Sequence, residues 1–145
     1  MTEIAFHFNV PDKLAYGCRL LRKVYLSGAS VVVTAEADVL AQLDQSLWSF
    51  SPTEFVPHCR SDAGEDNLAV TPVWLAESLQ DCARQEVLVN LGQGIPAGFE
   101  RFERFIEVVA QGDDERLAAR SRWKHYTDRG YTMKRHDLAT AKAGA

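Results

Sequence analysis

The feature that most constrains the fold is a strand–helix–strand pattern at the start of the chain. Residues Ile4–Val10 alternate apolar and polar side chains, which is typical of a strand. Lys13–Ser27 repeats apolar residues at helical spacing, between Asp12 as a suitable N-cap and Gly28 as a helix stop. Ser30–Ala35 is a β-branched run without alternation, which indicates a strand covered on both faces of a parallel sheet. The three segments together predict a βαβ unit.

The rest of the chain continues to alternate strands with helices. Two more long helices are expected, over Ala37–Trp48 and Asp113–Arg129. Further strands are expected over Leu68–Trp74, Val87–Leu91, Phe102–Val109 and Tyr131–Leu138, with a short helix over Leu75–Gln85 and a surface loop over 60–67. We therefore predict one α/β domain over residues 1–138, a three-layer sandwich around a mainly parallel, Rossmann-like sheet. Residues 139–145 have nothing to bury and are expected to be disordered.

A chain of 145 residues, 46% of them apolar, can bury one core without disulfides or a structural metal. Its apolar runs are far shorter than the roughly 18 residues that span a bilayer, and its start lacks the basic region of a signal peptide. We expect a cytoplasmic protein with no membrane partner. Its three cysteines, Cys18, Cys59 and Cys82, are odd in number and far apart, which favours reduced thiols over disulfides or a zinc site.

Charge is distributed unevenly along the chain. Residues 116–135 contain seven basic side chains against one acidic side chain, a local balance of +6 in a chain of net charge −4. The other 125 residues therefore carry −10. Because an acidic body repels a phosphate backbone, broad binding to duplex DNA is disfavoured, while one basic patch remains available to an anionic partner.

Two short motifs could carry catalytic or cofactor chemistry. Gly92–Gly98 has the pattern GxGxxxG, which is one residue longer than the dinucleotide fingerprint, and Pro96 removes a backbone donor from the loop. His58 and Cys59 are neighbours on an extended segment, so their side chains point to opposite faces and cannot pair directly. We predict a plain turn in place of a phosphate loop, no catalytic residue, no metal site and no cofactor.

The last helix combines basic and aromatic side chains on adjacent faces. Arg116, Arg120 and Lys124 form one stripe at a spacing of four residues, and Trp123 and Tyr126 lie beside it. Such a surface can hold a ligand that is both aromatic and acidic. A core-facing aromatic stripe with a solvated basic flank explains the same spacing, and the spacing alone leaves both interpretations open.

Large apolar side chains also gather in the middle of the chain. Trp48 ends the second helix, and Phe55 begins the segment Phe55–His58 after a proline-bounded turn. These aromatics either cap the core or anchor a protein interface, because tryptophan and phenylalanine are common in both.

Several motifs together resemble the chi subunit of bacterial DNA polymerase III holoenzyme, a clamp-loader accessory subunit. They stand in the order of that family and cover the chain from about Ile4 to Asp137: LDxxLW at 43–48, FVPH at 55–58, VLVNL at 87–91, FIEVV at 105–109, and RxRWKxY at 120–126 with Gly130 and Tyr131. No one of these motifs is very specific, but their ordered combination is.

The resemblance implies a non-catalytic protein whose nucleotide-binding-like fold has lost nucleotide binding. It implies two partners: the psi subunit of the clamp loader, and the acidic, Phe-terminated tail of single-stranded DNA-binding protein. By matching positions, Phe55 with Trp48 nearby corresponds to the psi surface. The tail site corresponds to Arg120, Trp123, Lys124 and the apolar neighbour Val109. The resemblance further implies indirect contact with DNA, a place at replication forks in the nucleoid, and a surface that a repair helicase could share.

Two functions of other classes remain open at this point. A small nucleotide-dependent enzyme would require a phosphate-binding loop, which the sequence does not supply. A protein that binds single-stranded DNA directly would use the basic helix for that purpose.

Overall fold

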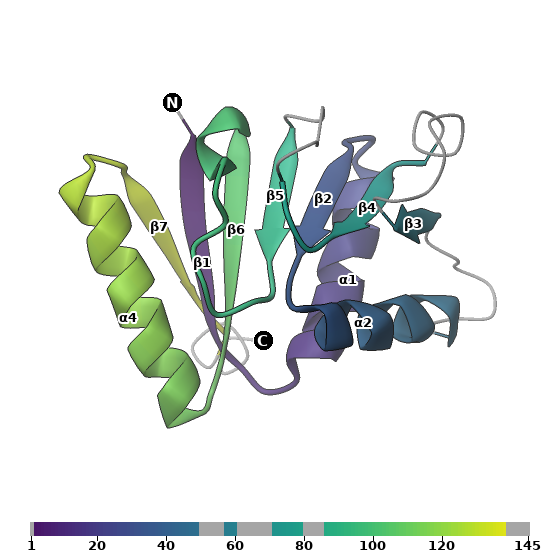
Figure 1. Ribbon diagram of the computed structural model, residues 1–145, viewed down its shortest axis with the longest axis horizontal. Helices are drawn as coiled ribbons and strands as arrows, with labels where there is room; N and C mark the ends of the chain where they lie inside the picture. The colour runs from purple at the N-terminus through teal and green to yellow at the C-terminus, as the bar shows by residue number, and fades with distance from the viewer. Residues whose placement is uncertain (1, 50–56, 61–70, 80–85, 139–145) are drawn as a thin grey trace.

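The computed structural model describes residues 2–49, 57–60, 71–79 and 86–138 (Figure 1). Their paired strands are all parallel and form a seven-stranded sheet in the order β3-β4-β2-β5-β6-β1-β7. The strands are β1 (Glu3–Val10), β2 (Val31–Thr34), β3 (His58–Arg60), β4 (Val73–Ala76), β5 (Val87–Asn90), β6 (Arg104–Ala110) and β7 (Met133–Asp137). The described helices are α1 (Lys13–Leu26), α2 (Ala37–Ser49) and α4 (Asp113–Asp128), with a 3-10 turn, η1, at Phe99–Arg101.

The helices cover both faces of the sheet, which confirms the three-layer α/β sandwich. Helices α1 and α2 pack on one face, where Leu21 and Leu43 join a buried cluster with Val33 and Ile106 of the strands. Helix α4 packs on the other face through Tyr126, in a second buried cluster. In Figure 1, α4 lies at the β7 end of the sheet and α2 at the β3 end.

The strand, helix and strand predicted at the start of the chain all form, with β5 and β6 lying between β1 and β2 in the sheet. Asp12 caps α1 by accepting a hydrogen bond from the backbone N–H of Ala15 at 3.1 Å. After the helix, Gly28 has φ +88°, a conformation that favours glycine. The whole of β2 is buried, as expected for an interior strand of a parallel sheet.

The region around Pro72 is where the predicted element boundaries are wrong. The strand expected over Leu68–Trp74 begins at Val73 and continues to Ala76, and residues 68–70 lie outside the described part. Pro72 has no N–H to donate to a neighbouring strand. Its carbonyl oxygen still accepts a hydrogen bond from the backbone N–H of Val31 at 2.9 Å, so Pro72 immediately precedes the strand. A short helix was expected over Leu75–Gln85. Residues 75–79 are not helical, and residues 80–85 lie outside the described part.

Two further predictions concern the C-terminal tail and membrane-spanning helices. The tail at 139–145 lies outside the described residues, so its predicted disorder stays a prediction. Within the described ranges, no helix is both long and apolar enough to cross a bilayer.

Candidate functional site

A pocket of about 510 Å³ lies between α4 and the carboxyl ends of β1, β6 and β7. Val109, Arg120 and Trp123, which the sequence analysis placed in one site, all line it. Val109 comes from the end of β6, and Arg120 and Trp123 are one turn apart on α4. In parallel α/β sheets, ligand crevices form outside the carboxyl ends of the strands, so the pocket occupies a common position for binding.

Aromatic side chains form the inner wall of this pocket. The ring of Trp123 meets the ring of Phe6 edge-on, with the centroids 5.0 Å apart. Arg135 of β7 places its guanidinium carbon 5.3 Å from the centroid of Phe8 and 6.0 Å from that of Trp123. These distances are those of cation–π contacts. The pocket therefore places an apolar aromatic surface directly beside positive charge.

Asn9 joins the strands to the helix at the mouth of the pocket. Its backbone has φ +60°, a left-handed conformation that asparagine tolerates better than most residues. Its side-chain amide donates to Asp137 at 2.8 Å, and its side-chain oxygen accepts from Arg116 at 3.3 Å. One side chain thus connects the ends of β1 and β7 to α4.

A buried polar network holds the inner face of α4 against the sheet. Glu107 of β6 is fully buried, and its Oε2 accepts from Arg122 Nε at 3.0 Å and from the Tyr126 hydroxyl at 2.6 Å. Its Oε1 accepts from Asn90 Nδ2 at 2.8 Å. Burial raises the pKa of the Glu107 carboxyl, while the Arg122 charge and these three donors act in the opposite direction. Burial and the neighbouring Glu107 carboxylate also raise the pKa of Tyr126, which stays a hydrogen-bond donor.

Arg122 extends this network to the loop after β5. Its Nη1 donates to the carbonyl of Gln93 at 2.7 Å, and its side chain is only 2% exposed. Tyr126 and Ala119 are buried in the core as well. The inner face of α4 is therefore core, as the core-facing interpretation expects, whereas Arg120 and Trp123 line the pocket.

Lys124, the fourth residue predicted for this site, is exposed and does not line the pocket. Phe8, Asn9 and Arg135 do line it, although none of them was predicted for this site. Alternation along the last strand could have placed Arg135 on one face with Met133. No local pattern shows that this strand pairs with β1, so the contact between Arg135 and Phe8 could not have been found from the sequence.

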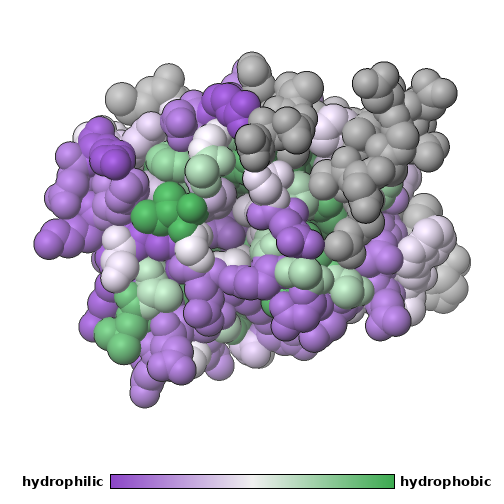
Figure 2. All heavy atoms as spheres, in the orientation of Figure 1, coloured by the Kyte–Doolittle hydropathy of each residue, from purple (hydrophilic) through white to green (hydrophobic). Residues whose placement is uncertain are grey.

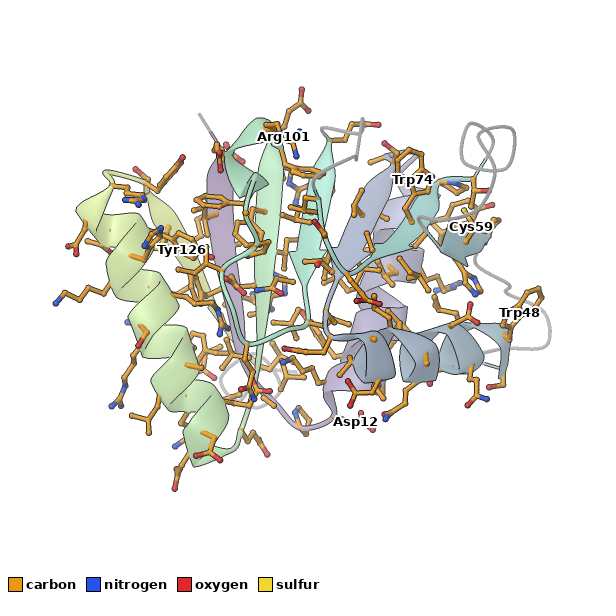
Figure 3. All side chains as sticks on the ribbon, viewed as in Figure 1. Asp12, Trp48, Cys59, Trp74, Arg101 and Tyr126 are labelled. Atoms are coloured by element: carbon orange, nitrogen blue, oxygen red, sulfur yellow. The ribbon has the colours of Figure 1, made fainter. Side chains whose placement is uncertain are left out.

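Trp48, one of the two residues predicted for the second surface, lies at the other end of the molecule from α4 (Figure 3). Trp48 is 64% exposed and extends outward from the end of α2 (Figure 3). Its ring meets that of His58 edge-on at 5.4 Å, and His58 Nε2 lies 2.9 Å from a carboxylate oxygen of Asp44. Phe55, the other residue predicted for this surface, lies outside the described residues.

The loop after β5 has a structure that disfavours phosphate. The N–H of Gly92 donates to Asn90 Oδ1 at 2.9 Å, and the N–H of Gln93 is directed to a carboxylate oxygen of Glu36 at 3.3 Å. Glu36 and Glu77 both line the crevice at the ends of β2, β4 and β5. Two carboxylates would repel a phosphate group at the position where related folds bind one.

His58 and Cys59 face opposite sides of the sheet, as their adjacency on an extended segment predicts. Cys18 and Cys59 are free, and Cys82 lies outside the described residues. Cys59 packs against the cluster on the α4 face of the sheet, whereas His58 meets α2 on the other face. Among the residues that the structure describes, no group of three or more histidine, cysteine or acidic side chains could hold a metal ion.

Comparison with known proteins gives one consistent result. Residues 1–134 match the family model described as DNA polymerase III chi subunit, HolC. The chain is 33% identical to DNA polymerase III subunit chi of Pseudomonas aeruginosa over 144 residues, which cover 95% of this chain and 98% of that protein. It is 32% identical to the subunit of the same name from Haemophilus influenzae over 120 residues, covering 80% and 81% of the two chains. The Escherichia coli subunit is 27% identical over 118 residues, covering 80% and 79%.

Proposed function

The chain belongs to the DNA polymerase III chi subunit family, and from this premise we propose that it bridges two partners at the replication fork. Chi is an accessory subunit of the polymerase holoenzyme, so a member of this family has protein partners within that complex. We propose that one partner is the psi subunit of the clamp loader and the other is the C-terminal tail of single-stranded DNA-binding protein. Through this tail, the chain contacts DNA indirectly.

The observation that carries this proposal is the composition of the pocket beside α4. Its wall is aromatic, through Phe8 and Trp123, and its rim is cationic, through Arg116, Arg120 and Arg135. A tail that ends in aspartates and a phenylalanine carboxylate presents one ring and several negative charges. The ring fits the apolar wall beside Val109, and the carboxylates fit the guanidinium groups.

The surface of α4 supports a charged ligand more than a broad apolar partner. Purple, hydrophilic side chains dominate the surface over α4 in Figure 2, and the green, apolar groups on that face form small separate areas. Extended apolar interfaces require larger continuous patches. A short peptide that inserts one ring and leaves its charges at the rim matches this surface.

Trp48 and the segment beginning at Phe55 form the proposed psi surface. An aromatic side chain with 64% of its surface exposed is a suitable anchor for a protein interface. Because Trp48 lies far from α4, psi and the tail could be held at the same time (Figure 3). A repair helicase that docks on the psi surface would compete with psi and not with the tail.

The proposal is tested by titrating the protein with a synthetic acidic peptide that ends in phenylalanine. Calorimetry should show one site per chain, and Trp123→Ala should remove most of the affinity because it removes the aromatic wall. Lys124→Ala, an exposed change on the same helix outside the pocket lining, provides the comparison. Equal binding by the Trp123→Ala variant and the native chain would contradict tail capture in this pocket.

A further inference from the structure

We call the pocket beside α4, lined by Val109, Arg120 and Trp123, the tail pocket. A second cationic pocket lies on the opposite face of the sheet from it. It has a volume of about 200 Å³ and is lined by His7 of β1, Lys23 of α1, Arg104 of β6 and Lys134 of β7, among others. His7 and Lys134 alternate along their strands with Phe8 and Arg135, which line the tail pocket. Because successive side chains of a strand point to opposite faces, the two pockets are on the two sides of the same strands.

Three cations from three different elements converge on this pocket. Lys23, Arg104 and Lys134 are all exposed, and within the described ranges none of them forms an ion pair. Glu3 is the one acidic side chain in the lining. The positive charge at the pocket is therefore only partly neutralised, although the chain as a whole is acidic.

His7 lies beside these cations in the lining of the pocket. Its ring centroid lies 4.9 Å from that of His136, and its Nδ1 is hydrogen-bonded to the Tyr16 hydroxyl. Burial, followed by the charges of His136, Lys23 and Arg104, lowers the pKa of His7 to about 4. At neutral pH the imidazole stays uncharged among cations, so it can take part in hydrogen bonding while the cations supply the charge.

Size and lining distinguish this pocket from the tail pocket. It has less than half of the volume, about 200 Å³ against about 510 Å³, and no tryptophan at its wall. Several cations around a small space suit a compact anion that accepts several hydrogen bonds, such as a phosphate group. A peptide tail with an aromatic end would have no comparable slot for its ring here.

We propose that Lys23, Arg104 and Lys134, with His7 beside them, bind a backbone phosphate of single-stranded nucleic acid. A flexible single strand can present one phosphate to a narrow pocket, whereas a rigid duplex would bring many phosphates close to the acidic body. The site does not depend on tail capture, because it uses the other face of the sheet. A chain holding a protein tail beside α4 could thus contact a nearby strand on its α1 side.

The test measures fluorescence anisotropy of a labelled oligodeoxythymidine at low salt and over a salt series. Arg104→Glu and Lys134→Glu should each weaken binding about fivefold or more and reduce the slope of log affinity against log salt by about one. Arg129→Glu makes the same charge change at the exposed C-cap of α4 and should weaken binding less than about twofold. Affinity for the acidic Phe-terminated peptide should be the same in all three variants and the native chain, which separates this site from the tail pocket.

Four results would overturn the proposal. The first is that the native chain does not bind the oligonucleotide at low salt, and the second is that Arg129→Glu loses as much oligonucleotide affinity as the two pocket variants. The third is weaker peptide binding in the pocket variants, and the fourth is a preference for another anion. The last is checked with inorganic phosphate and with phosphatidylglycerol vesicles. If either of these is bound through Arg104 and Lys134 while the oligonucleotide is not, the pocket serves a free anion or a lipid headgroup.

Discussion

Arg122 of α4 and Glu107 of β6 form an ion pair that is almost completely removed from solvent. Arg122 Nε lies 3.0 Å from Glu107 Oε2, and the two side chains are 2% and 0% exposed. Through Gln93, the same guanidinium also holds the loop after β5. The pair therefore fixes the position of α4 on the sheet, and with it the positions of Arg120 and Trp123 in the pocket beside α4.

We expect Arg122→Leu to lower the free energy of unfolding by about 3–5 kcal/mol, because it leaves the Glu107 carboxylate buried without its counter-charge. Burial raises the pKa of Glu107, and loss of Arg122 raises it further. A group with a raised pKa in the folded state destabilises the fold as the pH rises above its ordinary value. The loss should thus shrink as the pH falls toward 4.5, the ordinary pKa of a glutamate side chain. Urea unfolding across this pH range measures both effects.

The double variant Arg122→Leu with Glu107→Leu is the control for this interpretation. Replacing both partners by apolar side chains removes the unpaired charge, so the double variant should lose less stability than the sum of the two single variants. Strict additivity would show that the two side chains act independently and that their contact contributes nothing measurable.

Most of the fold could be predicted because its signals are local. Asp12 and Gly28 mark the ends of α1 in the sequence, and the buried run of β2 indicates an interior parallel strand. The boundary at Pro72 was missed because the apolar run was taken to include the proline, whereas the strand begins one residue after it and runs to Ala76. The strand order could not be predicted either, because β7 near the C-terminus pairs with β1 near the N-terminus and no local sequence pattern indicates that pairing.

The lining of the pocket beside α4 was predicted in part, for a similar reason. Arg120 and Trp123 lie on adjacent faces of one helix through their spacing, and the family resemblance added Val109. Arg135 was missed because its contact with Trp123 depends on how β7 lies beside β1. The ion pair of Arg122 was missed as well, since an arginine in a basic helix is normally solvated, and only Glu107 on the adjacent strand makes its burial possible.

His7 should make the stability of the protein depend on pH below neutrality. Its pKa is 6.5 in an unfolded chain and about 4 in the fold, so the unfolded state takes up a proton first as the pH falls. Stability should therefore fall between these two pKa values, by roughly 1–3 kcal/mol for a half-buried group. Urea unfolding near pH 6.5 and near pH 4 measures the change, and His7→Gln should lose less over the same interval. An identical loss in His7→Gln would assign the effect to other groups.

Trp48→Ala should weaken binding of psi by about 2 kcal/mol and change the free energy of unfolding by less than about 0.5 kcal/mol. The reason is that Trp48 is 64% exposed, so it contributes little to the core. Phe55→Ala should likewise weaken psi binding and leave tail binding intact. Leu26→Ala, at a large apolar side chain that is 63% exposed on α1, is the matched control and should leave psi binding unchanged. Surface plasmon resonance with immobilised psi measures all three, and equal losses in Trp48→Ala and Leu26→Ala would place the psi surface elsewhere.

The salt dependence of peptide binding at the tail pocket should distinguish the contribution of charge from that of the buried ring. Exposed ion pairs contribute only about 0.2–1 kcal/mol each and are screened by salt, so Arg120→Ala should weaken peptide binding at low salt and flatten its salt dependence. Trp123→Ala should weaken binding at every salt concentration, because a buried ring is not screened. Amidating the C-terminus of the peptide or deleting its last phenylalanine should each remove most of the binding, as measured by calorimetry over a salt series. If a peptide carrying both changes bound as well as the original, the ring and the terminal carboxylate would play no part, and the basic face of α4 would be better explained as a contact for DNA.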